Sequence, residues 1–352
     1  MAIDDDKLQA FMGQAVTDMG AALATALVYV GDRLGYYREL AAHGPLNASE
    51  LAQRTDTVER LAAEWLAGQA AGGYISYDPA TAKYSISEEQ AFALATPDSP
   101  VYLGGLVDVI TSVYADADKV VSAFKGQQTL GWHQHDHRLF TGTERFFRPG
   151  YAANLVPEWI PALDGVEQRL QSGIHVADVG CGHGASTILM AQAYPASTFV
   201  GVDYHAESIE AARKAASEAG VADRVTFEVG TAQSYPGSFD LVALFDSLHD
   251  MGDPAGAAAH IRSSLNEGGS LLLVEPNAAD RPEDNFNPVG RLFYAASASI
   301  CLPNAVSQGG GVETLGAQAG EAATRSVFDG AGWSSFRRAT ETPFNVVYEA
   351  KP

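Results

Sequence analysis

Apolar side chains recur every three or four residues along the first thirty positions of the chain. This spacing predicts one long amphipathic helix over Leu8–Val30 with a broad apolar stripe. The stripe either packs on its own domain or is covered by a second subunit, because a long apolar face at a chain end often needs a partner. We expect a homodimer whose interface is built mainly by residues 1–100.

The next sixty residues predict short helices followed by a hairpin. Glycine, proline and capping residues mark the boundaries, because they end helices or satisfy free backbone N–H groups. The expected elements are a helix over Gly31–His43, a helix over Glu50–Arg54 capped by Asn47 or Ser49, a helix over Glu59–Ala71, and strands over Tyr74–Tyr77 and Lys83–Ile86. Helix, turn, helix and a two-stranded wing form a winged-helix arrangement.

Residues 98–165 are expected to be mostly helical, with interruptions at Gly126–Gly131 and at Arg148–Gly150. Beyond residue 173, strand patterns alternate with helical patterns, which is typical of a parallel sheet with crossover helices. The expected strands are Val176–Val179, Thr198–Asp203, Val225–Val229, Leu241–Phe245 and Ser270–Val274, followed by a hairpin of Phe336–Thr340 and Asn345–Ala350. The predicted fold class is α/β, with a helical winged-helix domain over residues 1–165 and a Rossmann-like seven-stranded domain over 166–352.

Composition narrows the function classes. The 352 residues include 22 basic and 43 acidic side chains, a formal net charge of −21, which disfavours nucleic acid and anionic lipid as partners. The longest nearly apolar run, Gly20–Gly31, is shorter than the roughly 18 residues of a membrane span. The first residues do not resemble a secretion signal. Two cysteines cannot form a disulfide framework, so we expect a cytoplasmic protein.

A glycine-rich turn follows the first strand of the predicted sheet, over Asp178–Ala185. Glycines let the backbone turn tightly and let a ligand approach the main chain. The spacing also matches a dinucleotide-binding pattern, which is weak evidence by itself. Asp178 precedes the first glycine and would repel a pyrophosphate but suits an ammonium group. Asp203 ends the second strand and can accept hydrogen bonds from ribose hydroxyls, so the pair favours a nucleoside with a positive charge, such as S-adenosylmethionine.

On these residues, positions 173–352 resemble the class I S-adenosylmethionine-dependent methyltransferases. The resemblance rests on Val176–Gly184, on Val200–Asp203 and on the closing hairpin. It implies that Asp178–Gly184 surround the methionine moiety and that Asp203 holds the ribose. The cofactor-binding residues that it implies are Asp178, Gly180, Cys181, Gly182, Asp203, Tyr204 beside the adenine, Thr231 and Ala232 at the adenine edge, and Phe245. Family members often carry an acid in place of Thr231.

A histidine follows the fourth predicted strand, in the segment Leu248–Asp253. The carboxyl ends of parallel strands form the ligand site in such folds, and an imidazole can accept a proton near neutral pH. A winged-helix domain before a methyltransferase domain also resembles the dimeric small-molecule O-methyltransferases. That resemblance implies that His249 is the general base and that Glu275 orients it. Glu321 lies near a further family glutamate, but its spacing differs and no role is carried over.

Weaker signals lie outside these motifs. Three potential metal ligands, His133, His135 and His137, fall within five positions of the sequence. No second cluster of zinc-like spacing accompanies them, so we predict no metal. Phe146 and Tyr151 are candidate pocket residues, and Asn285–Gln308 is an insertion that could wall an apolar pocket. Cys181 and Cys301 lack the sequence context of a nucleophile and are expected to be packing residues.

Two function classes remain to be compared. The first is a cytoplasmic, dimeric methyltransferase of small-molecule or secondary metabolism, acting on a small, aromatic hydroxylated acceptor, with nitrogen, sulfur and carbon acceptors left open. The second is a winged-helix regulator that uses the cofactor domain as a sensor. The whole chain also resembles actinobacterial methyltransferases of unassigned substrate with a regulator-like N-terminal domain. Residues 44–90 hold three basic and seven acidic side chains, which offers little to a phosphate backbone and favours the enzyme.

Overall fold

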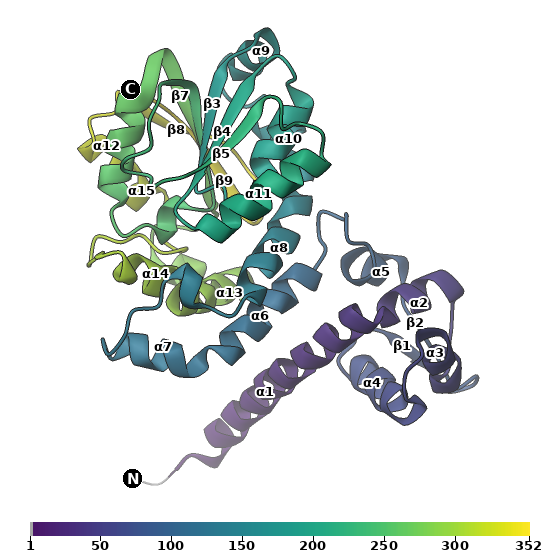
Figure 1. The fold of residues 1–352 in the computed structure, drawn as a ribbon. Helices are drawn as coiled ribbons and strands as arrows, with labels where there is room; N and C mark the ends of the chain where they lie inside the picture. Colours follow the sequence, from purple (N-terminus) through teal and green to yellow (C-terminus); the bar gives the residue numbers. More distant parts are fainter. Residues whose placement is uncertain (1–2) are drawn as a thin grey trace. The chain divides into compact units, whose positions relative to one another are not determined.

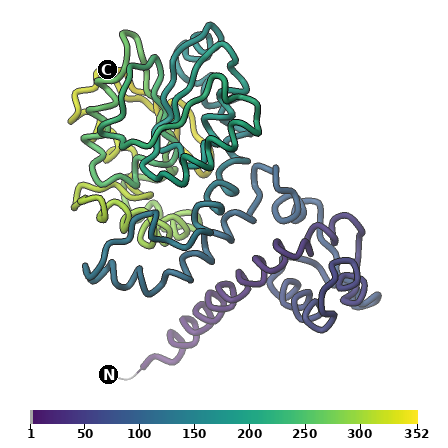
Figure 2. Tube along the Cα trace, in the orientation of Figure 1, coloured from purple at the N-terminus to yellow at the C-terminus, as the bar shows by residue number. Residues whose placement is uncertain are grey.

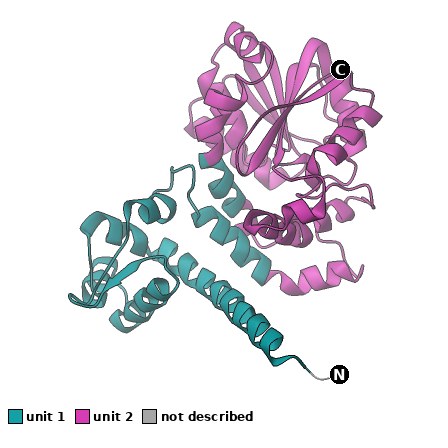
Figure 3. Cartoon of the chain, turned by 180° about the vertical axis from the view of Figure 1, so that it is seen from behind, with its two compact units in different colours: residues 1–114, 141–149 teal, residues 115–140, 150–352 magenta. Residues whose placement is uncertain are grey.

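The computed structural model describes residues 3–352. The chain divides into two compact units, residues 1–114 with 141–149 and residues 115–140 with 150–352 (Figure 3). The boundary expected near residue 165 lies inside the second unit, because the segments 115–140 and 150–165 pack with the sheet domain. Phe140, for example, stacks on His205 with ring centroids 4.7 Å apart. Residues 141–149 belong to the first unit, where Arg145 pairs with Asp32 at 2.9 Å and with Asp108.

Helix α1 spans Asp5–Leu34 and runs without interruption from its cap at Asp4 (Figure 2). The predicted long helix is therefore confirmed. The expected helix over Gly31–His43 is wrong at its start, because Gly35 adopts φ 74°, a left-handed conformation that ends α1. A separate helix, α2, then covers Tyr36–His43.

The winged-helix prediction is confirmed in the first unit. Its elements are α3 (Ala48–Thr55), α4 (Glu59–Ala71), β1 (Ser76–Asp78), β2 (Lys83–Ser85) and α5 (Glu88–Leu94). Asn47 caps α3 in a capping box with Glu50, as the sequence indicated. The core forms around Trp65, whose ring meets Tyr36 and Tyr37 edge-on and whose indole N–H donates to the Leu27 carbonyl at 2.7 Å.

Among residues 3–352, α1 is the helix of sufficient length and apolar composition to cross a membrane. This corrects the expectation drawn from the short run Gly20–Gly31, because an average over 18 residues tolerates isolated polar side chains and an unbroken run does not. Only Val28, Gly31 and Asp32 of α1 are buried within the first unit. Most of its other large apolar side chains, such as Phe11 at 64% and Leu23 at 77%, are exposed there, whereas Leu27 and Tyr29 pack against the core of the unit.

The helices between the wing and the sheet are α6 (Gly104–Ala115), α7 (Ala117–Phe124), α8 (Arg138–Asn154) and α9 (Val166–Ser172). The interruption expected at Arg148–Gly150 is wrong, because α8 continues through Pro149. Proline removes one backbone hydrogen bond but already has a helical φ, and the flanking residues keep the helix. A π-helical turn, η2, follows at Leu155–Trp159.

The second unit is built on a seven-stranded sheet of order β5-β4-β3-β6-β7-β9-β8, in which β9 runs antiparallel to β7 and β8 and the other neighbouring strands are parallel. Helices α10 (Ala185–Ala193) and α11 (Ala206–Glu218) cover one face, and α12 (Pro254–Ser264) and α15 (Gly320–Gly330) cover the other (Figure 1). The strands are β3 (His175–Val179), β4 (Thr198–Asp203), β5 (Val225–Val229), β6 (Phe239–Phe245), β7 (Leu265–Pro276), β8 (Ser335–Glu341) and β9 (Asn345–Lys351). The α/β class, the parallel sheet and the closing hairpin are confirmed.

The pairing register places the carboxyl ends of β3 and β4, and those of β6 and β7, next to each other. Val179 pairs with Val202, and Phe245 pairs with Val274. The residues that follow these pairs therefore emerge at one edge of the sheet, the edge at which β3, β4, β6 and β7 end. Strand β7 begins at Leu265, five residues earlier than predicted, because Leu265 pairs with Phe239 of β6 before a register shift, and Gly268 between them and the main ladder has φ 75°.

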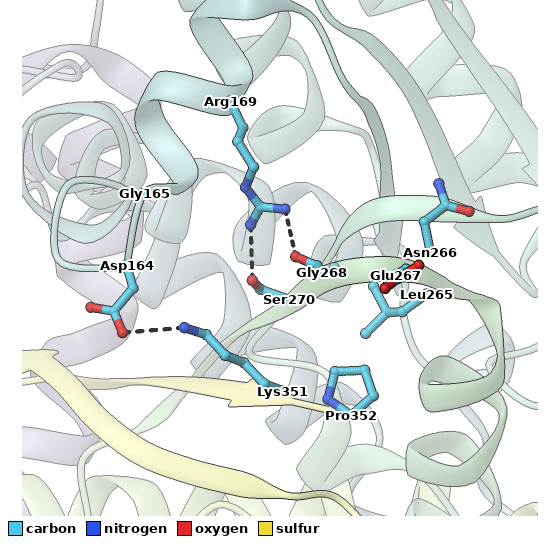
Figure 4. Close-up of a pocket in the computed structure, with 11 residues that line it drawn as sticks. Asp164, Gly165, Arg169, Leu265, Asn266, Glu267, Gly268, Ser270, Lys351 and Pro352 are labelled. Carbon is cyan, nitrogen blue, oxygen red and sulfur yellow. Dashed lines mark hydrogen bonds and ion pairs between the residues drawn. The ribbon is translucent and has the colours of Figure 1, made fainter.

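A cavity of about 590 Å³ lies at the opposite edge, near the start of β7 and the end of β9 (Figure 4). Arg169 crosses its wall and donates to the Gly268 carbonyl and the Ser270 hydroxyl, while Lys351 pairs with Asp164. None of the predicted site residues lines this cavity. It does not coincide with the chemistry that the sequence indicates.

Candidate active site

The glycine-rich turn adopts the conformations that its composition predicts. Gly180, Gly182 and Gly184 all have positive φ, at 77°, 52° and 79°. A Cβ at Gly180 would lie 2.7 Å from Ser247, and one at Gly184 would lie 2.6 Å from Phe227. A Cβ at Gly182 meets nothing within 4 Å, so that the turn is tight on both sides and open in its middle. This open stretch of backbone is where a ligand can approach the main chain.

Asp178 lies inside β3 and is 1% exposed. Its Oδ2 accepts hydrogen bonds from Ser186 and Thr187, both at 2.6 Å. Its Oδ1 is buried without a hydrogen-bond partner. Burial raises the pKa of this carboxyl to about 6 although the two hydroxyls oppose the rise. A cationic group would satisfy the free oxygen and lower the cost of the buried charge.

Asp203 lies at the end of β4 and accepts from two backbone amides, that of Gly182 at 3.0 Å and that of His205 at 2.9 Å. Burial raises its pKa as well. Two carboxylate oxygens offer about four acceptor positions, so hydroxyl groups of a ligand can still be accommodated. The contact with Gly182 joins the second acid directly to the glycine turn.

The residues that the sequence assigns to the adenine side differ in their exposure. Tyr204 is 39% exposed, and its hydroxyl lies 3.3 Å from Oδ1 of Asn304. Thr231 is exposed and shares a hydrogen bond with Ser234 at 2.8 Å, whereas Ala232 is buried. Cys181 is buried beside the turn. These positions remain predicted contacts.

The residues at this edge fit S-adenosylmethionine. The orphaned oxygen of Asp178 suits its ammonium group, the open face of Gly182 admits the main-chain approach, and Asp203 suits ribose hydroxyls. Hydroxyl groups bond to Asp178, whereas His205 and His183 lie near Asp203 and partly oppose the rise of its pKa. A ligand that supplies positive charge therefore complements the site.

His249 lies in the short helix η3 (Leu248–Asp250), directly after β6. Its Nδ1 lies 2.6 Å from Oε2 of Glu275, the penultimate residue of β7. The other oxygen of Glu275 accepts from the Leu248 backbone amide at 3.0 Å. One buried carboxylate thus holds both the imidazole and the turn that carries it. The contact that the resemblance implied between His249 and Glu275 is present.

Asp250 lies on the opposite side of the same imidazole. Its Oδ1 is 3.2 Å from Nε2 of His249 but lacks hydrogen-bond geometry, and its Oδ2 accepts from the Trp132 indole at 2.8 Å. Burial disfavours the charged imidazole, but the carboxylates of Glu275 and Asp250 outweigh burial and hold the pKa of His249 well above its usual value. The Cys301 thiol also contacts His249, and burial raises the pKa of this thiol to about 12.

A second hydrogen-bonded group at this edge was not found from the sequence. Asp246 has φ 49°, and its carboxylate accepts from the Tyr151 hydroxyl at 2.8 Å and from Asn345 at 2.9 Å. Burial, reinforced by Glu275, raises the pKa of Asp246 to about 7. Tyr151 also packs on Phe245, the last residue of β6, with centroids 5.5 Å apart, and its place in the pocket stays a prediction. Asp246 could have been recognised from the sequence as an acid that directly follows a buried strand.

The three histidines of the segment 133–137 do not converge. The side chain of His135 is buried and lies 3.0 Å from Asp116, His133 lies edge-on to Tyr204, and His137 is exposed. Within residues 3–352, the group that could hold a metal is instead His249 with Asp250 and Cys301. Glu321 pairs with Arg325 and Arg338, apart from His249, and Phe146 packs on Phe147 in the first unit.

Comparison with protein-family models matches residues 170–306 to a methyltransferase domain and residues 21–96 to the Rv2258c-like winged HTH domain. The chain is 33% identical over 118 residues to demethylmenaquinone methyltransferase of Lactiplantibacillus plantarum, covering 32% of this chain and 50% of the relative. It is 36% identical over 107 residues to 27-O-demethylrifamycin SV methyltransferase of Amycolatopsis mediterranei, covering 30% and 39%. The chain thus spans half or less of the length of these curated relatives.

Solved structures extend the likeness to the whole fold. The chain matches human N-acetylserotonin methyltransferase in complex with SAM at a TM-score of 0.69, with 18% identity, 100% of this chain and 99% of that chain covered. At this identity the likeness describes the fold. The family matches show that the chain joins an Rv2258c-like winged helix-turn-helix domain over residues 21–96 to a methyltransferase domain over residues 170–306.

Proposed function

We propose that this chain transfers the methyl group of S-adenosylmethionine to the oxygen of a small, aromatic hydroxylated molecule. The observation that carries the proposal is the buried pair of His249 and Glu275, with Nδ1 and Oε2 only 2.6 Å apart, at the edge that also holds Asp178 and Asp203. When bound, S-adenosylmethionine supplies a methyl group on positively charged sulfur. Asp178, Gly182 and Asp203 would hold it.

The pair supports the assignment of His249 as general base. With Nδ1–H donating to Glu275, the neutral imidazole presents Nε2 as its proton acceptor. The acceptor oxygen would lose its proton to Nε2 as it bonds to the methyl carbon. The two flanking carboxylates strengthen this base, because they raise its pKa. A bound cationic cofactor would lower that pKa again and release the neutral form nearer to neutral pH.

The test is a screen of small-molecule acceptors with methyl-labelled S-adenosylmethionine. Phenols and catechols should accept the label, and mass spectrometry of the product should locate it on oxygen. The similarity to an enzyme named as a 27-O-demethylrifamycin SV methyltransferase supports starting with hydroxylated aromatics. Label on nitrogen, sulfur or carbon alone would overturn the oxygen assignment. Absence of cofactor binding by calorimetry would overturn the cofactor assignment as well.

The regulator alternative finds no support in the winged region. Each basic side chain of residues 44–90 is paired: Arg54 with Glu39 at 3.9 Å, Arg60 with Glu64 at 2.6 Å and Lys83 with Glu50 at 2.8 Å. A phosphate backbone would have to compete with these acids. A gel shift at physiological salt should therefore show no binding of duplex DNA, and a salt-sensitive shift at submicromolar protein would revive the regulator.

A second copy of this chain is the proposed partner of α1. The exposed apolar side chains of α1 lie at the three- and four-residue spacing that one helix face requires, and nothing in its first twenty residues is buried in its own unit. Light scattering should report a dimer for the wild type and a monomer for Leu23→Glu, while the exposed polar control Gln9→Glu stays dimeric. A monomeric wild type that partitions into lipid vesicles would instead favour a membrane role for α1.

A further inference from the structure

Three ligand-capable side chains converge beside the proposed base. One ligand atom from each of His249, Asp250 and Cys301 lies within 4.8 Å of the other two, and Nε2 of His249 is 3.2 Å from Oδ1 of Asp250. The three residues are 6%, 8% and 7% exposed. They come from η3 and from the π-helical turn η5 (Ser297–Cys301), which brings a thiol to the histidine across 52 positions of sequence.

One carboxylate oxygen of the site has an ion-pair contact with His249 but no hydrogen bond. Oδ1 of Asp250 is buried, makes no hydrogen bond and lies 3.2 Å from Nε2 of His249. A buried carboxylate oxygen without a donor is costly unless a cation or a proton donor faces it. The remaining oxygen of Asp250 is held by the Trp132 indole, so the side chain cannot turn away without losing that bond.

The histidine is already oriented as a metal ligand. Its Nδ1 faces Glu275, which leaves Nε2 directed to the side of Asp250 and Cys301. A carboxylate behind a ligating imidazole fixes the ring and raises its basicity, and this arrangement is usual around zinc. Nitrogen, oxygen and sulfur together form a ligand set that suits Zn²⁺ rather than Mg²⁺ or Ca²⁺, which take oxygen ligands.

The spacing is close to what one ion requires. Zinc bonds of about 2.0–2.3 Å in a tetrahedron place the ligand atoms roughly 3.3–3.8 Å apart. The pair from His249 and Asp250 is within about 0.1 Å of that range, and Cys301 needs a shift of at most about 1 Å to join them. Three protein ligands leave a fourth position open for water.

We propose that His249, Asp250 and Cys301 form a binding site for a thiophilic divalent cation, Zn²⁺ above all, and that the bound ion inhibits methyl transfer. The lone pair of Nε2 cannot bind the ion and accept the substrate proton at once, so metal and base activity exclude each other. Only the inhibitory part rests on the proposed function. Binding displaces the thiol proton of Cys301 and leaves the imidazole without a proton on Nε2, so it releases protons to solution.

The binding arm uses the full chain and the metal alone. Co²⁺ added to chelator-treated protein should give a sulfur-to-cobalt charge-transfer band and a tetrahedral visible spectrum, and calorimetry should show one Zn²⁺ per chain. Cys301→Ser should remove the band and weaken Zn²⁺ binding about 100-fold, and Glu275→Gln should weaken it about 10-fold or more. The control Cys181→Ser, which alters the other cysteine, should keep the band. Asp250→Asn provides a second ligand variant, and circular dichroism verifies the fold of each.

Wild-type Zn²⁺ affinity no tighter than that of Cys301→Ser, or cobalt binding without the sulfur band, would overturn the site. The activity arm compares methyl transfer in chelator with transfer in added Zn²⁺, for the wild type and for Cys301→Ser. Strong inhibition of the wild type alone is expected, and equal inhibition of both would overturn the inhibitory assignment. Inactivity of the chelator-treated wild type with every acceptor would count against the proposed function and leave the spectroscopic result standing.

Discussion

The two halves of the proposed active site handle buried charge in opposite ways. At the ends of β3 and β4, Asp178 is buried and Asp203 is half-buried, and burial raises the pKa of both, although His205 and His183 partly oppose the rise at Asp203. At the ends of β6 and β7, Glu275 and Asp250 enclose His249, whose pKa they raise. A ligand can bring a positive charge to the buried Asp178 of the first half, whereas the second half contains its own imidazole between two carboxylates. We infer that the first half selects a cationic cofactor and that the second half provides the proton acceptor, the imidazole of His249.

The largest expected effect on turnover comes from removing the imidazole of His249. His249→Ala should lower turnover by roughly 10²–10⁴-fold, the range of a positioned acid–base group. Cofactor affinity should change little, because the cofactor contacts lie on the other two strands. Steady-state kinetics and calorimetry measure the two quantities, with the exposed His137→Ala as the matched control. Near-normal turnover on a phenolic acceptor would reduce the second half to a positioning role.

The partner of the histidine can be altered without removing the imidazole. Glu275→Gln removes one of the anions that raise the pKa of His249, so that pKa should fall. The rate rises with pH as the imidazole loses its proton, and its inflection should therefore move to lower pH in the variant. Turnover at the plateau should fall about 10- to 100-fold, because the ring loses its charged orienting partner. An unchanged inflection in the pH–rate profile would show that Glu275 does not raise the pKa of His249.

Asp178→Asn tests the other half. Losing the carboxylate should weaken S-adenosylmethionine binding about 10- to 100-fold, the effect of one hydrogen bond to a charged group. In the wild type, the affinity should rise about tenfold from pH 5 to pH 7, because a carboxyl with a pKa of about 6 must ionise to face an ammonium. Calorimetry across pH measures both. The exposed Asp223→Asn is the control, and a pH dependence that survives in Asp178→Asn would assign it to another group.

The same variant should affect stability in the opposite direction. Burial raises the pKa of Asp178 from 3.8 to about 6, so the folded chain binds this proton more tightly than the unfolded chain. The free energy of unfolding should therefore fall as pH rises between these values and remain lower above them. Without cofactor at pH 7.5, Asp178→Asn should be more stable by roughly 1–3 kcal/mol. Thermal unfolding at pH 4 and pH 7.5 tests this, and a variant less stable at pH 7.5 would show that burial is not the dominant cost.

Much of the site's cofactor half could be predicted from short stretches of sequence. The turn Gly180–Gly184 needs positive φ at each glycine, and the acids Asp178 and Asp203 fall at fixed places relative to their strands. Such features depend on neighbours a few residues away, so spacing reveals them. The predicted identity of His249 and Glu275 came from resemblance, and their 2.6 Å contact required the alignment of β6 with β7.

What the sequence by itself determined is therefore the order of elements, the winged helix, the parallel sheet and the chemistry of the glycine turn, since period and turn residues are local signals. Tertiary structure alone decided which distant groups meet. Cys301 and Trp132 reach the His249 cluster, and Tyr151 reaches Asp246, across 95 residues in the last case. Tertiary structure also carried α8 through Pro149, where a local rule predicted a break. The physical reason is that packing and buried electrostatics depend on chain crossings that no local pattern records.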